Sequence, residues 1–156
     1  MDLGFRGKTF VLTGAGGGLG RATTQLLADE GANLILTDQS ASELESVAGE
    51  LGGTHATVPA DLTSERGIAS VIERADAEGG ADGLVHAAGI TGAKGDPLEV
   101  GDDDFMACWQ TNFMSAVRLM RGLVPGMVER GWGRVVVIVS ENAIQPYADE
   151  AVYNVS

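Results

Sequence analysis

A glycine-rich stretch near the start of the chain has the composition of a phosphate-binding turn. Eight residues, Thr13-Gly14-Ala15-Gly16-Gly17-Gly18-Leu19-Gly20, separate an apolar run from an amphipathic stretch. The pyrophosphate of a dinucleotide needs nearby backbone N–H groups and a helix N-terminus pointing at it, and glycines let the main chain approach without Cβ clashes. The stretch therefore predicts a dinucleotide site, and an ordinary tight turn is the alternative.

An acidic residue at the end of the next apolar run fits the same ligand. Asp38 lies eighteen residues beyond Gly20, where a carboxylate would hydrogen-bond the hydroxyls of the adenosine ribose. A carboxylate there would repel a 2′-phosphate, and no Lys or Arg lies within the glycine turn or directly after Asp38, where Gln39 stands. These residues favour NAD over NADP. The alternative makes Asp38 a turn residue at the end of a strand.

A tyrosine late in the chain has the side chain that carbonyl chemistry needs. Carbonyl reduction requires a proton donor to the developing alkoxide and alcohol oxidation requires a base, and one phenol does both if its pKa is brought towards neutrality. Tyr153 is the candidate, and Ser140 ends an apolar run thirteen residues earlier. A hydroxyl at the carboxyl end of a strand lies where open α/β folds bind ligands. A strand-terminating serine and a surface tyrosine are the alternatives.

The elements that must position these residues alternate between short apolar runs and amphipathic stretches. This rhythm is typical of βαβ units and predicts an α/β fold with a mainly parallel sheet. We expect one domain without internal repeats. The predicted strands cover residues 9–13, 33–38, 55–59, 83–87 and 134–140, and the last is apolar enough to be covered on both faces. The predicted helices cover residues 19–30, 42–51, 64–78 with Ser64 as N-cap, and 104–130 with a possible kink at Pro125.

Composition narrows the possible partners and compartments. The 156 residues carry 22 acidic and 10 basic side chains, a formal charge of −12, which should repel nucleic acid and anionic membranes. The single Cys108 excludes an internal disulfide, and no stretch has the pattern of a secretory signal or the length of a membrane span. We therefore expect a cytoplasmic protein with no nucleic-acid or membrane partner and no metal.

The spacing Thr-Gly-x-x-x-Gly-x-Gly resembles the short-chain dehydrogenase/reductase family, and the resemblance extends over the whole chain. It implies a Rossmann-like, doubly wound parallel sheet, here truncated after about five strands, in one NAD-binding domain over residues 1–156. The resemblance also implies an adenine-contacting Asp61 with Leu62 after the third strand; a helix-capping carboxylate is the alternative. The implied cofactor-binding residues are Gly14, Gly16, Gly18, Leu19, Gly20, Asp38, Asp61, Leu62, Ala88 and Gly89.

Two further segments carry the resemblance. After the fourth strand the family has Asn-Asn-Ala-Gly, and here His86-Ala87-Ala88-Gly89 retains only the Ala-Gly half. We expect His86 to be a packed, hydrogen-bonded strand residue and not a catalyst. Asn112 matches the asparagine that holds a water in the family's proton relay, against the alternative of a polar residue at a helix kink. By the same resemblance Ser140 orients the substrate oxygen and Tyr153 exchanges the proton.

The family's catalytic lysine, four residues after the tyrosine, would fall at position 157, beyond Ser156. Such a lysine lowers the pKa of the phenol and holds the nicotinamide ribose, so we expect a dehydrogenase fragment whose fifth strand is a poorly covered edge and which forms a homo-oligomer. The resemblance implies hydride transfer between NAD and a small carbonyl or secondary alcohol. A catalytically inactive dinucleotide-binding or interaction module is the alternative, and a sugar-nucleotide epimerase is less favoured by the glycine spacing.

Overall fold

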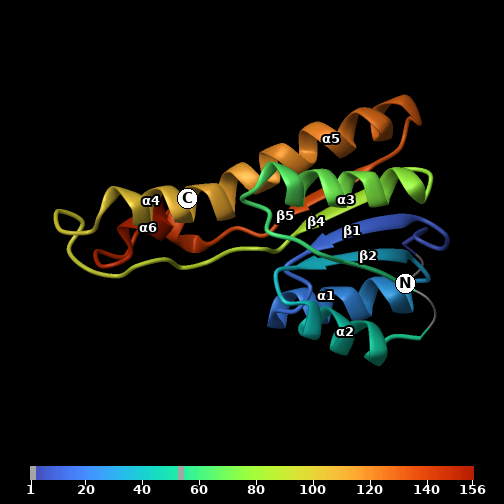
Figure 1. Ribbon diagram of the computed structural model, residues 1–156, viewed down its shortest axis with the longest axis horizontal. Coiled ribbons are helices and arrows are strands. Elements are labelled where there is room, and N and C mark those ends of the chain that lie inside the picture. Colours follow the sequence, from blue (N-terminus) through green and yellow to red (C-terminus); the bar gives the residue numbers. More distant parts are fainter. Residues whose placement is uncertain (1–2, 53–54) are drawn as a thin grey trace.

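A single parallel sheet with helices on both faces organises the molecule (Figure 1). The computed structural model describes residues 3–52 and 55–156. The strands run β3-β2-β1-β4-β5 across the sheet, and every neighbouring pair is parallel. Their bounds are Thr9–Thr13 (β1), Asn33–Asp38 (β2), Ala56–Pro59 (β3), Gly83–His86 (β4) and Arg134–Val137 (β5). This is the predicted α/β, Rossmann-like fold.

The helices divide between the two faces of the sheet. In Figure 1, α1 and α2 lie below the sheet, and α3 and α5 lie above it. The bounds are Gly18–Asp29 (α1), Ala41–Glu50 (α2), Glu65–Ala77 (α3), Asp102–Trp109 (α4), Ser115–Glu129 (α5) and Ala151–Asn154 (α6), with a π-helical turn over Gln110–Met114 and a 3₁₀ turn over Glu141–Ala143. None of these described helices has the length and apolar character needed to cross a bilayer.

The core consists of two layers because successive side chains of a strand point to opposite faces of the sheet. Val11 and Ile35 pack with side chains of α3 and α5 in one layer. Leu12 and Leu36 pack with side chains of α1 and α2 in the other. All four are at most 1% exposed, so the sheet that carries the glycine turn is held rigidly from both sides.

Most predicted elements agree with the structure within two residues. The predicted bounds of β1 and β2 are those observed. Ser64 caps α3 as expected, since its hydroxyl oxygen accepts a hydrogen bond from the Gly67 amide over 3.0 Å.

The predicted helix over residues 104–130 is not continuous. It begins at Asp102, changes to a π turn over Gln110–Met114 and resumes as α5. Pro125 lies inside α5, which continues to Glu129. The irregularity therefore falls at the π turn and not at the proline, and single π turns inside helices often occur at functional sites.

The apolar run of the fifth strand predicted cover on both faces, which was wrong, whereas the expectation of a poorly covered edge strand is confirmed. β5 ends at Val137, and all four of its residues are exposed. Within the described chain β5 pairs only with β4, so it is an edge strand. Its apolar character continues past the strand, where Val139 is 80% exposed.

Candidate active site

The glycine turn joins β1 to α1 and lies against the loop that follows β4. Gly14 has φ +66°, and a Cβ there would be 2.8 Å from the Ala87 carbonyl carbon and the Ala88 nitrogen. A Cβ at Gly20 would lie 2.0 Å from the Gly14 carbonyl oxygen. Neither position can carry a side chain, because the three segments are packed backbone to backbone.

The first turn of α1 is free to face an anion. Its N-cap residue is Gly17, its first turn holds no acidic residue, and the N-cap makes no side-chain hydrogen bond. The N–H groups and the positive end of the helix dipole are therefore available for a phosphate group. Leu19 in this turn is 67% exposed. The turn thus fits the pyrophosphate predicted from the glycine spacing.

Asp38 binds the glycine turn directly. Its Oδ2 accepts a hydrogen bond from the Gly16 amide over 3.1 Å, and its Oδ1 accepts one from the Ser40 amide over 3.2 Å. The turn role that was the alternative for Asp38 is therefore present. Because each carboxylate oxygen accepts two hydrogen bonds, the side chain keeps acceptors for ribose hydroxyls. The ribose role stays a prediction that this geometry permits.

Arg21 was not predicted from the sequence as a site residue, although it directly follows Gly20. Its Nε donates to the Gly16 carbonyl oxygen over 3.2 Å. Its two terminal nitrogens bind carboxylates on α2, those of Glu43 at 2.5 Å and Glu50 at 2.8 Å. The one cation beside the described glycine turn is thus paired with two acidic side chains.

Asp61 organises the turn before α3. Its Oδ1 accepts hydrogen bonds from the Thr63 hydroxyl over 2.7 Å and from the Thr63 amide over 2.9 Å. These bonds, that of the hydroxyl first, hold the pKa of Asp61 below its usual value. The side chain of Leu62 is buried in the core, so only its main chain is available to a cofactor. The adenine contact of this pair stays a prediction.

His86 is packed between β1 and α5. Its Nδ1 lies 2.9 Å from the Thr13 hydroxyl oxygen and its Nε2 lies 3.2 Å from the Ser115 hydroxyl oxygen. The side chain is 1% exposed, and this burial lowers the pKa of His86 to about 4. The expectation of a buried, hydrogen-bonded residue is confirmed.

Asn112 lies in the π turn and binds the loop after β4. Its Oδ1 accepts from the Ile90 amide over 2.8 Å, and its Nδ2 donates to the Ile90 carbonyl oxygen over 2.9 Å. The same Nδ2 donates to the Ser156 hydroxyl oxygen over 2.8 Å. Asn112 therefore sits at an irregular helical turn, as the alternative supposed, and its side chain also borders the cavity described next.

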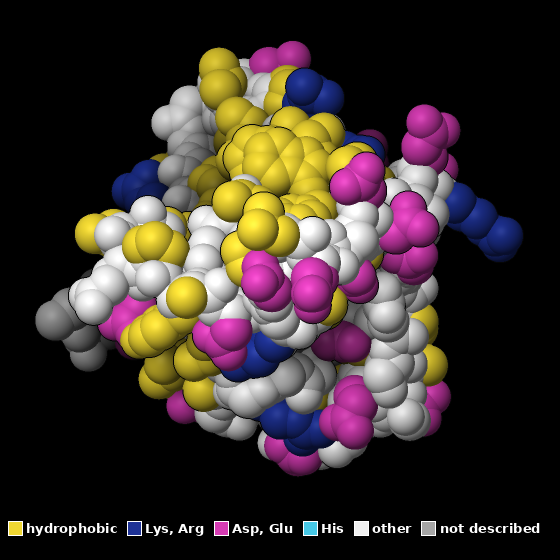
Figure 2. Space-filling model, turned by 90° about the vertical axis from the view of Figure 1, so that its left-hand side faces the viewer, with side chains coloured by type: hydrophobic (Ala, Val, Ile, Leu, Met, Phe, Trp, Pro, Cys, Tyr) yellow, Lys and Arg dark blue, Asp and Glu magenta, His cyan; other side chains and the backbone are white. Residues whose placement is uncertain are grey.

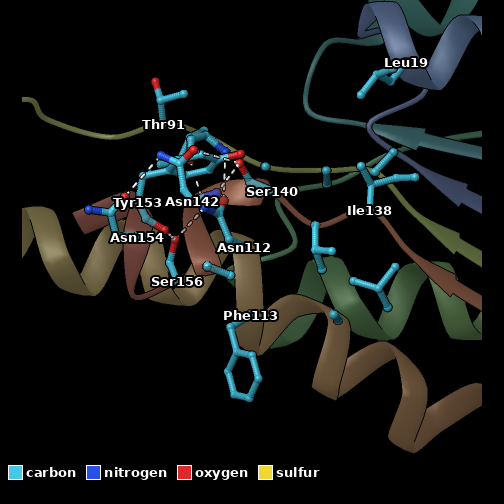
Figure 3. Close-up of a pocket in the computed structure, with 18 of the residues that line it drawn as sticks. Leu19, Thr91, Asn112, Phe113, Ile138, Ser140, Asn142, Tyr153, Asn154 and Ser156 are labelled. Carbon is cyan, nitrogen blue, oxygen red and sulfur yellow. Dashed lines mark hydrogen bonds between the residues drawn. The ribbon is translucent and has the colours of Figure 1, made fainter. Parts of the chain in front are cut away.

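A cavity of about 510 Å³ opens at the carboxyl end of the sheet. Segments far apart in the sequence line it, and the predicted residues among them are Leu19, Ala88, Gly89, Asn112, Ser140 and Tyr153. Figure 3 shows its polar side chains on one side and Leu19 on the other; the labelled polar residues are Thr91, Asn112, Ser140, Asn142, Tyr153, Asn154 and Ser156. The other predicted cofactor residues lie outside the lining of this cavity.

Asn142 is a cavity residue that the sequence reasoning missed. The Ser140 hydroxyl donates to Asn142 Oδ1 over 3.1 Å and accepts from the Asn142 amide over 3.3 Å. Asn142 Nδ2 donates in turn to Glu150 Oε2 over 2.7 Å and to Asn154 Oδ1 over 3.1 Å. Glu150 is paired with Lys94, which lowers the pKa of that carboxyl. The network fixes Ser140, and only the two-residue spacing from Ser140 could have indicated Asn142.

Tyr153 reaches the cavity from α6, a helix of four residues. Its side chain is half-buried, and its hydroxyl has no hydrogen-bond partner within the described residues. No Lys or Arg is among the described residues that line the cavity. Glu141 is also outside the lining, and its carboxylate accepts from the Tyr147 hydroxyl over 3.1 Å. The phenol is thus available to a ligand.

The end of the molecule that carries α4 and α6 combines apolar and acidic surface. Figure 2 views this end and shows apolar side chains gathered near its centre, with acidic side chains around them. Leu98 and Ile144 are each more than 90% exposed. A small neutral ligand suits this apolar and acidic surface better than an anionic ligand does.

Comparison with known proteins gives consistent matches. A family model described as short chain dehydrogenase matches residues 8–156. D-beta-hydroxybutyrate dehydrogenase of Rhizobium meliloti is 35% identical over 88% of this chain and 55% of its own length. The L-sorbose reductase of Gluconobacter frateurii, solved with NADPH and L-sorbose, superposes with a TM-score of 0.93 at 37% identity, over 99% of this chain and 60% of that one.

A structure of NAD⁺-bound xylitol dehydrogenase superposes with a TM-score of 0.90 at 30% identity, over 97% of this chain and 60% of that one. The chain thus spans less than two thirds of the length of each of these relatives.

Proposed function

The chain belongs to the short-chain dehydrogenase/reductase family, and from this premise we propose that it binds NAD and serves hydride transfer to or from a small carbonyl or secondary-alcohol substrate. The observation that carries the proposal is the arrangement at the carboxyl end of the sheet. There the glycine turn and the free N-terminus of α1 lie beside a cavity that Ser140 and Tyr153 both line.

The relatives named above support the substrate class. One is a hydroxybutyrate dehydrogenase, one a sorbose reductase and one a xylitol dehydrogenase. Each of these names describes interconversion of a hydroxyl and a carbonyl group on a small molecule. The cavity of this chain, neutral and lined mainly by apolar and hydroxyl or amide side chains, suits such a substrate.

The choice of NAD rests on residues of this chain, since the relatives differ: sorbose reductase was solved with NADPH and xylitol dehydrogenase with NAD⁺. Asp38 is anchored to the Gly16 amide, and its carboxylate beside the glycine turn supports a site that would repel a 2′-phosphate. Arg21 is the nearby cation that would favour a phosphate, and Glu43 and Glu50 already neutralise it. Both features disfavour NADP.

Three side chains of the cavity have separate roles in the proposed reaction. When bound, the nicotinamide supplies or accepts the hydride. Tyr153 exchanges the proton with the substrate oxygen, for which its hydroxyl is free. Ser140 orients that oxygen by rotating its hydroxyl hydrogen away from Asn142 Oδ1, while the Asn142 amide continues to hold the Ser140 oxygen. Asn112 holds the relay that connects the site to solvent.

Substitution of the phenol tests this assignment. Tyr153→Phe removes one oxygen from a half-buried ring, so the fold and the glycine turn remain. We expect NADH fluorescence titrations to be unchanged and turnover of a panel of ketones and secondary alcohols to fall below detection. Tyr147→Phe is the matched control, because its hydroxyl binds Glu141 outside the cavity. Turnover retained in Tyr153→Phe would contradict the role of Tyr153.

A dinucleotide-binding module without catalysis is the second candidate. The observation that favours it is that no cation among the described residues lines the cavity to stabilise a phenolate. NADH binding without turnover of any substrate in the wild-type panel would support this module. Turnover that depends on Tyr153 would exclude it.

A further inference from the structure

A continuous row of hydrogen bonds crosses the centre of the molecule beneath the proposed cofactor site. Thr13 at the end of β1, His86 at the end of β4 and Ser115 at the start of α5 form it. All three side chains are at most 1% exposed. Water therefore offers no alternative partners, and each donor and acceptor in the row must be satisfied by the protein.

The direction of every bond in the row follows from one carbonyl group. The Thr111 carbonyl oxygen can only accept, so the single hydroxyl hydrogen of Ser115 is donated to it. The Ser115 oxygen must then accept from His86, which requires a hydrogen on His86 Nε2. One ring nitrogen of a neutral histidine accepts when the other donates.

The other half of the row follows in the same way. His86 Nδ1 accepts the hydroxyl hydrogen of Thr13 over 2.9 Å. This leaves the lone pairs of Thr13 Oγ1 for two amides, those of Ala88 at 3.1 Å and Ala87 at 3.2 Å. Each hydroxyl and ring hydrogen is used once, and the Ala87 amide is shared with the Thr13 carbonyl oxygen at 3.3 Å. A hydrogen on Nδ1 would instead meet Thr13 Oγ1 and leave the Thr13 hydroxyl without an acceptor.

The two ends of the row are the two sides of the proposed site. At one end, Ala87 and Ala88 form the surface on which Gly14 packs, with no room for a Cβ. At the other end, Thr111 precedes Asn112 in the π turn. His86 is the only described side chain that bonds to both Thr13 and Ser115.

We propose that His86 is a positioning residue: its neutral ring, locked with the hydrogen on Nε2, holds the loop 87–89 in register with both the glycine turn and the π turn. The ring does not line the cavity, so it acts through Thr13 and Ser115 and not on a ligand. The consequence for cofactor affinity rests on the function proposed above. The hydrogen-bond order is independent of that function.

Nitrogen-15 NMR of the wild-type chain at neutral pH tests the hydrogen-bond order without any ligand. Long-range correlations between the ring protons and nitrogens distinguish the two neutral tautomers. We expect His86 to show a protonated Nε2 and an unprotonated Nδ1. A hydrogen on Nδ1, or averaging between tautomers, would overturn the proposal.

Amide hydrogen exchange tests the positioning role. Thr13→Val removes the acceptor of the Ala88 amide, and Thr13→Ser keeps it. We expect exchange at Ala88 to accelerate about tenfold in Thr13→Val and not in Thr13→Ser, while Leu36 in the core of β2 is unchanged. Equally accelerated exchange at Leu36 would mean that Thr13→Val destabilises the whole protein, and would contradict the proposal.

The far end of the row gives a sharper test. Ser115→Ala leaves Thr13 and Ala88 untouched but removes the acceptor of the Nε2 hydrogen. We expect mixed His86 tautomers and faster exchange at Ala88 in this variant; an unchanged Ala88 would show that the row transmits nothing. NADH affinity should fall about tenfold in Thr13→Val and be restored in Thr13→Ser. If the wild type binds no NADH, the proposed function fails, while the tautomer and exchange results still decide this inference.

Discussion

We predict that the protein loses stability in mild acid because His86 is buried in its neutral form. The ring is buried, is 1% exposed, and has burial as the largest influence on its pKa, which falls from 6.5 to about 4. Between these two values the unfolded chain binds a proton that the folded chain excludes. The contribution of His86 to the free energy of unfolding is therefore fully present above pH 6.5 and is lost as the pH falls towards 4.

The size of the loss follows from the same two pKa values. The shift from 6.5 to about 4 corresponds to about 3 kcal/mol, at about 1.4 kcal/mol for each pH unit. A loss of this size is a large fraction of the stability of a typical domain. The lowered pKa values of Asp61 and Glu150, whose ordinary values are 3.8 and 4.5, act at lower pH. The interval from about pH 6.5 to about pH 4.5 therefore reports on His86.

Urea unfolding followed by tryptophan fluorescence at several pH values between 4.5 and 7.5 measures the effect. His86→Asn is the matched variant, because its amide oxygen can still accept from Thr13 but the side chain does not titrate. We expect the wild type to lose about 2–3 kcal/mol over this interval and the variant to lose almost none. A flat wild-type profile, or the same slope in both proteins, would refute the reasoning.

Two further predictions concern packing. Gly20→Ala places a Cβ 2.0 Å from the Gly14 oxygen and should lower the free energy of unfolding by at least about 3 kcal/mol. Gly49→Ala, in α2, meets no atom within 4 Å and should raise the free energy of unfolding by about 0.5 kcal/mol. Thermal melts compare the two variants, and equal melting temperatures would contradict the description of the turn. Trp132 lies 4.5 Å from Lys8 Nζ and 4.9 Å from Arg134 Cζ, so Trp132→Leu should cost about 1–2 kcal/mol in urea unfolding. An unchanged midpoint would show that these cations contribute nothing at the sheet edge.

Much of the fold was predictable because it depends on local patterns. The runs Thr9–Thr13 and Asn33–Asp38 each have three consecutive large apolar residues at their centre, and both became strands with the predicted bounds. Ser64 has the side chain and position of an N-cap, and it is one. The glycine turn was also predictable from the sequence, since steric limits on Cβ atoms act within a few residues.

What the sequence did not indicate depends on contacts between distant segments. The π turn brings Asn112 to the Ile90 main chain, twenty-two residues away, and helical periodicity contains no sign of that contact. The apolar run that forms β5 indicated burial on both faces, but burial is a property of the neighbours that cover a strand. The Ser140–Asn142–Glu150 network joins the N-cap of a 3₁₀ turn, a residue within that turn and the residue before α6, with no repeat to mark it.

The central claim is that the carboxyl end of the sheet binds NAD through the glycine turn and Asp38. Titration of the chain with NADH and, separately, NADPH, followed by nicotinamide fluorescence, tests it most directly. We predict saturable NADH binding that is at least about tenfold tighter than NADPH binding, with this preference lost in Asp38→Asn and kept in the matched exposed variant Asp29→Asn. Absence of saturable NADH binding, or equal affinity of the wild type for both nucleotides, would contradict the account.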